Sequence, residues 1–156
     1  MGWTIDFDLS IVLLAVLIWI GITSFLKLRK GKDFVYLLFF TVFYIYLVEI
    51  IDLTQFPIYL SDSMRENIGQ NVLTNTNFVP LINISLDQIN TSLLNILMTI
   101  PFGFGLPFIT SFQFKRVVLF GCLTSLTLEV LQFFTGLSAR FTFRFVDIND
   151  IIFNTI

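Results

Sequence analysis

Residues 9–26 read LSIVLLAVLIWIGITSFL, an apolar run that contains no charged residue. An α-helix rises about 1.5 Å per residue, so the run nearly matches the roughly 30 Å hydrocarbon core of a bilayer. Basic residues follow it at Lys27, Arg29, Lys30 and Lys32, whereas a cleaved signal peptide carries its positive charge before the apolar stretch. The run therefore predicts a membrane-spanning helix that stays in the protein.

Apolar runs recur along the rest of the 156-residue chain, which is 56% hydrophobic and 13% charged. Soluble domains are about 45–50% apolar and about 25% charged. The further runs are residues 34–53, 92–112, 116–134 and 147–156, with a polar loop at 54–91. We expect one all-α domain (1–156), a polytopic membrane helix bundle with four complete transmembrane helices and the start of a fifth. Since a span needs about 20 residues, we also expect the sequence to stop inside its last helix.

The basic residues predict the orientation of the bundle. The connection after the first helix holds four of them, and the connection between the third and fourth helices holds Lys115 and Arg116. The opposite side holds only Arg65, Arg140 and Arg144. The positive-inside rule then places the N-terminus and the polar loop outside the membrane.

The residue types also narrow the chemistry. The chain has no histidine and a single cysteine, Cys122. Histidine-based acid–base catalysis, histidine-ligated zinc and an internal disulfide are thereby excluded. We expect Cys122 to be a packing residue, and we expect no metal, no cofactor and no nucleic-acid partner.

Polar side chains at membrane depth are costly and usually mark a function or a partner. Ser125, Glu129 and Gln132 follow spacings of four and three, so they share one helical face. Asn95 begins a similar face on the third helix, and Arg140 precedes the last helix. We predict a polar cluster in the outer third of the bilayer, made of Asn95, Glu129, Gln132, Arg140, Arg144, Asp147, Asp150 and Asn154. Such a cluster can bind a phosphate or carboxylate through arginine, or a cation through its acids.

Each of these residues also has a structural alternative. Asp147 can cap the last helix, with Asp150 completing a capping box. Glu129 can form an ion pair with Arg140 or Arg144, and Asn95 can serve helix packing.

The prolines of the third helix predict a kink or a break there.

Four segments of the second half match known motifs, in the right order and at plausible spacing. They are NFVPL (77–81), NILMTIPFGFGLP (95–107), SLTLEVLQ (125–132) and RFVDINDIIFNT (144–155). This half of the chain resembles the VanZ family. The motif residues are Asn77, Pro80, Pro101, Gly103, Pro107 and Ser125, while Gly105 stands where the family usually has an apolar residue. The family continues with a glycine and the remainder of a final helix.

The resemblance implies a bacterial plasma-membrane protein of about five helices. Its family is named for a role in resistance to the glycopeptide antibiotic teicoplanin. The leading hypothesis is a non-enzymatic protein that reduces glycopeptide action at the outer membrane face. The alternatives are an enzyme acting on a lipid-linked cell-envelope substrate and a small transporter or flippase. The expected partners are membrane lipid, a lipid-linked cell-wall precursor or a glycopeptide, and a second copy of the chain.

Overall fold

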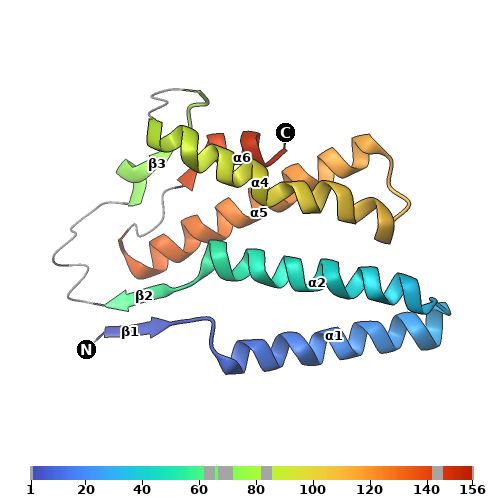
Figure 1. Cartoon of the computed structure of the whole chain (residues 1–156). Coiled ribbons are helices and arrows are strands. Elements are labelled where there is room, and N and C mark those ends of the chain that lie inside the picture. The colour runs from blue at the N-terminus through green and yellow to red at the C-terminus, as the bar shows by residue number, and fades with distance from the viewer. Residues whose placement is uncertain (1, 62–65, 67–71, 82–85, 142–145, 156) are drawn as a thin grey trace.

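Four long helices run side by side in the computed structural model, which describes residues 2–61, 66, 72–81, 86–141 and 146–155 (Figure 1). They are α1 (Leu9–Lys30), α2 (Phe34–Gln55), α4 (Leu86–Ile109) and α5 (Phe114–Ala139). Each is long and apolar enough to cross a membrane. A shorter helix, α6 (Ile148–Thr155), follows. The predicted all-α membrane bundle is thereby confirmed.

The helices extend beyond the apolar runs that predicted them. Helix α1 begins after Asp8, whose carboxylate accepts from the amides of Ser10 and Ile11, and it continues through the basic residues to Lys30. Gly31 ends it with φ at 61°, a left-handed conformation that glycine adopts without a Cβ clash. Hydropathy marks only the part of a helix that lies in lipid, and capping residues set the true ends.

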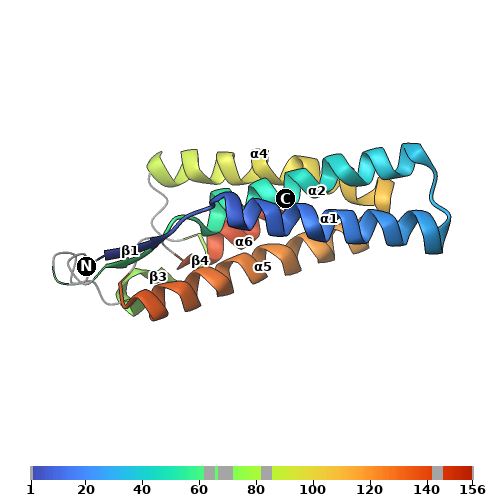
Figure 2. The same ribbon diagram turned by 90° about the horizontal axis from the view of Figure 1, so that it is seen from below.

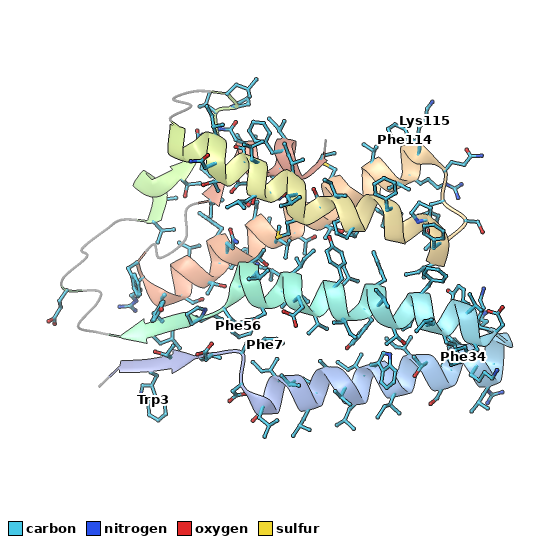
Figure 3. The ribbon with its side chains drawn as sticks, viewed as in Figure 1. Trp3, Phe7, Phe34, Phe56, Phe114 and Lys115 are labelled. Carbon is cyan, nitrogen blue, oxygen red and sulfur yellow. The ribbon has the colours of Figure 1, made fainter. Side chains whose placement is uncertain are left out.

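The two ends of the bundle differ in character. The α1–α2 and α4–α5 connections lie together at one end, near Phe34 and Lys115 (Figure 3). Trp3, Phe7 and Phe56 lie at the opposite end. All six basic residues of these two connections therefore gather at a single end of the molecule.

Short strands at the other end were not predicted from the sequence. Strand β1 (Gly2–Ile5) pairs antiparallel with β2 (Ile58–Ser61), with Trp3 opposite Leu60 and Ile5 opposite Ile58. Next to a 3₁₀ turn (Val72–Asn75), strand β3 (Thr76–Asn77) pairs in parallel with β4 (Val146–Asp147). The second pair joins the polar loop to the segment that leads into α6.

Helices α2 and α4 pack through a small aromatic core. Phe43, Phe102 and Leu106 are buried there. A Cβ atom on Gly105 would lie only 2.8 Å from Cε2 of Phe43, and closer still to Cδ2. Gly105 therefore lets the Phe43 ring approach the α4 backbone.

Helix α4 runs continuously through Pro101 and Pro107, so of the predicted kink or break the break does not occur. A helical proline frees a carbonyl in the preceding turn, and neighbouring side chains can satisfy it. The hydroxyl of Tyr46 on α2 donates to the carbonyl of Met98 at 2.8 Å, next to Leu97, whose carbonyl loses its helical donor at Pro101. At the end of α4, Tyr36 donates to the carbonyl of Ile109 at 3.1 Å.

Helix α1 lies at the edge of the bundle and buries none of its residues (Figure 2). Two hydrogen bonds hold it to α2: Trp19 Nε1 donates to Thr41 Oγ1 at 3.1 Å, and the Tyr44 hydroxyl donates to the carbonyl of Ala15 at 2.7 Å. In water, an apolar helix that buries so little of its surface against the rest of the protein would not be stable in this position. Lipid is the solvent that its apolar surface requires.

Candidate functional site: a polar cluster around helix α6

Helix α6 packs against both α4 and α5 and enters the bundle at the end away from the basic connections (Figure 1). Asp147 caps its first turn, because its Oδ1 accepts from the amide of Asn149 at 2.8 Å. The same oxygen accepts from Nδ2 of Asn77 at 2.9 Å. The Asp147 carboxylate thus caps α6 and also binds the distant 77–81 segment beside it.

Asp150 does not complete the capping box. Its Oδ1 accepts instead from Nδ2 of Asn95 on α4 at 2.7 Å. Asn95, a member of the predicted cluster, therefore joins α4 to α6. A charge-assisted hydrogen bond of this length is among the stronger contacts available inside a protein.

Glu129 of α5 is buried, and its Oε2 accepts from the backbone amide of Asp147 at 3.2 Å. The carboxyl groups of Asp147 and Asp150 lie close enough to interact with it electrostatically. The structure thus brings together the three predicted carboxyl groups, one from α5 and two from the start of α6.

Of the two predicted arginine partners of Glu129, the structure describes only Arg140. Arg140 is exposed, and it ends α5 in a left-handed conformation with φ at 61°. Within the described ranges it forms no ion pair with Glu129, and Arg144 lies outside those ranges. Asparagine amides and backbone N–H groups bind the carboxylates instead. Amides can satisfy a buried carboxylate without a second desolvated charge.

Two further predicted residues join α5 to its neighbours. Nδ2 of Asn154 donates to Ser125 Oγ at 2.9 Å, which fixes the last turn of α6 to α5. Nε2 of Gln132 donates to the carbonyl of Thr54 at 2.9 Å, which fixes α5 to the last turn of α2. Gln132 thus faces α2, although it shares a helix with Glu129.

Asn149 is a member of the cluster that sequence reasoning did not single out. It is buried, and its Oδ1 accepts from the amide of Leu81 at 2.7 Å. Leu81 has φ at 59°, so this bond holds a turn that a branched side chain rarely adopts. The only signal was its place between two acids in the first turn of α6.

Every residue of this cluster lies within the part of the chain that a family model matches. A family model described as VanZ/LLP1 matches residues 43–156, which is more than half of the chain. The chain belongs to the VanZ/LLP1 family. No curated protein and no solved structure matches it significantly.

The VanZ/LLP1 match begins within α2 and includes α4, α5 and α6. Two of the six motif residues belong to the cluster: Asn77 bonds to Asp147, and Ser125 is buried beside Asn154. The other four are exposed: Pro80, Pro101, Gly103 and Pro107. In this VanZ/LLP1 protein the first two motif elements thus contribute one asparagine each to the cluster, Asn77 and Asn95.

The cluster offers hydrogen-bond donors and acceptors. In the part of the chain that the structure describes, no three His, Cys, Asp or Glu residues form a group that could hold a metal ion. Carboxylate oxygens accept hydrogen bonds, and asparagine amides can both donate and accept. Such a surface can recognise amide, hydroxyl and amine groups of a ligand.

Proposed function

We propose that this VanZ/LLP1 protein acts at the outer face of a bacterial plasma membrane and lowers susceptibility to teicoplanin-type glycopeptides without catalysing a reaction. The observation that supports this is the gathering of Glu129, Asp147 and Asp150 at one end of the bundle, held by asparagines of distant segments. A polar network that ties together four segments of the family region is costly to build inside a membrane protein.

The orientation follows from the charge of the two ends. The basic connections lie at the end opposite the cluster. The positive-inside rule assigns that basic end to the cytoplasm. The cluster and the N-terminus, at the opposite end, are then outside. The outer leaflet is where lipid-linked wall precursors and glycopeptides meet.

The proposed ligand is a lipid-linked cell-wall precursor or the glycopeptide itself. Both carry amide and hydroxyl groups, which match the acceptors and donors of the cluster. By holding or shielding such a group, the protein would reduce the amount of glycopeptide bound at the cell surface. Membrane lipid surrounds the apolar helices, and a second copy of the chain is a further proposed partner.

Binding of fluorescent teicoplanin to intact Gram-positive cells tests the proposal. Cells that express the wild type are expected to bind less of it than cells without the protein, and Glu129→Gln is expected to restore binding. Glu49→Gln is the matched control, because Glu49 is an exposed acid on α2 outside the cluster. Equal binding by wild-type and Glu129→Gln cells, with both proteins inserted at equal levels, would refute the role of the cluster.

A membrane enzyme is the second candidate, favoured by the three neighbouring carboxyl groups. Two carboxyl groups can act as acid and base on a lipid-linked envelope substrate. Lipid extracts from cells with the wild type or with Asp150→Asn separate the two functions. A lipid species that changes only with the wild type would support the enzyme, and unaltered lipids would leave the non-catalytic function.

A further inference from the structure

The polar residues of α4, α5 and α6 form two layers. Asn95, Glu129 and Asp150 make the layer nearer the end of the bundle. Four residues further into the bundle along each helix are the polar residues Thr99, Ser125 and Asn154. A four-residue step corresponds to about 6 Å along a helix, so the second layer lies one turn deeper than the first.

The deeper layer contains an unsatisfied acceptor. Asn154 donates through Nδ2 to Ser125 Oγ, but its Oδ1 is fully buried and accepts no hydrogen bond from any described residue. If the oxygen and nitrogen of the amide were exchanged, the oxygen would face Ser125 and the buried nitrogen would lack an acceptor instead. A buried polar atom without a partner has lost its hydration without compensation, so native structures rarely leave one unpaired.

A small cavity lies beside this amide. Thr99, Thr124, Ser125 and Asn154 supply polar groups to its lining, and mostly apolar residues of α2, α4 and α5 supply the rest. It leaves about 20 Å³ for the centre of a water molecule. Roughly 10–15 Å³ is enough to hold one water, provided that two or more polar partners are present.

We propose that this cavity binds a water molecule that bridges α6 to α5. The water donates to Oδ1 of Asn154 and accepts from the hydroxyl of Ser125 or Thr124. It satisfies the buried amide, and it extends the polar network one helical turn deeper than Glu129. The site does not depend on the glycopeptide function, because it follows from the packing of α4, α5 and α6 alone.

Water-edited solid-state NMR of the full chain in lipid bilayers tests this site, with asparagine side chains labelled with ¹⁵N. Magnetisation is expected to pass from water to Nδ2 of Asn154, whose signal is assigned by its loss in Asn154→Gln. Thr124→Leu fills the cavity and is expected to reduce that transfer severalfold, while the signal of Asn77 stays unchanged. Thr127→Leu is the matched control, since Thr127 is exposed on the same helix and its hydroxyl donates to the carbonyl of Leu123, one turn earlier in that helix.

Two results would overturn the proposal. Wild-type protein that transfers no magnetisation to Asn154, while Asn77 receives it, would show a dry cavity. An unchanged signal in folded Thr124→Leu would place the water elsewhere. If Thr124→Leu does not give the wild-type backbone spectrum, Thr124→Val removes only the hydroxyl at nearly constant volume and is expected to weaken the transfer in the same direction.

Discussion

The hydrogen bond between Asn95 and Asp150 joins α4 to α6, so variants that remove it test how the cluster is held together. Asn95→Leu keeps the size of the side chain but removes the donor that lies 2.7 Å from the Asp150 carboxylate. Asp150→Leu removes the acceptor, and the double variant removes both.

The expected energies differ among the three variants. A hydrogen bond to a charged group contributes about 1.5–3 kcal/mol in water-soluble proteins, whereas bonds between membrane helices average about 0.6 and reach about 1.7 kcal/mol. We therefore expect each single variant to lower the free energy of unfolding by about 1–3 kcal/mol, because each leaves a half-buried polar group without its partner. Replacing both partners by apolar groups is often nearly neutral, so the double variant is expected to lose less than either single variant.

Unfolding of purified protein in bicelles, followed by steric trapping or by titration with SDS, gives the three energies. Because the double variant is expected to lose less than either single variant, the coupling energy of the double-mutant cycle is expected to exceed the larger single loss, at about 1–3 kcal/mol. Thr127→Val is the control, since it removes an exposed hydroxyl and is expected to change stability by less than about 0.5 kcal/mol. Additive losses at Asn95 and Asp150 would refute the inference that this bond joins α6 to α4.

The packing of α2 on α4 leads to further predictions. Gly105→Ala is expected to lower the free energy of unfolding by about 1–3 kcal/mol relative to Gly103→Ala. Only the alanine at position 105 would place a Cβ against the ring of Phe43. Equal stabilities of the two variants in an SDS titration would contradict this. Tyr46→Phe is expected to cost about 0.6–1.7 kcal/mol and to speed amide exchange around Met98, whose carbonyl loses its donor; unchanged exchange would show that the hydroxyl does not support α4.

The membrane bundle could be predicted from the sequence because hydropathy acts on whole segments. An apolar run of about 20 residues has few stable states outside a bilayer, whatever its neighbours are. The helix ends beyond the bilayer were predicted less well, since α4 begins at Leu86 rather than at residue 92. The strand pairs β1–β2 and β3–β4 join segments far apart in sequence, and strands this short carry no periodic signal.

The candidate site was predicted by residue type but not by pairing. Spacing on a helix shows which residues share a face, so Glu129, Asp150 and Asn95 were expected near one another. It does not show which side chain meets which: Asp147 and Asp150 accept hydrogen bonds from the amides of Asn77 and Asn95, and these pairings were not predicted. Asn149 escaped notice because its partner is a backbone amide, and any residue can supply one.

The location of the cluster at the outer side of the membrane is the claim on which the proposed function depends, and cysteine labelling tests it most directly. With Cys122 replaced by alanine, single cysteines are placed at Ser138, an exposed residue near the cluster end of α5, and at Lys115, at its basic end. A membrane-impermeant maleimide is expected to label Ser138→Cys in intact cells and Lys115→Cys only after permeabilisation. The reverse pattern would place the cluster in the cytoplasm, where it could not act on glycopeptides at the cell surface.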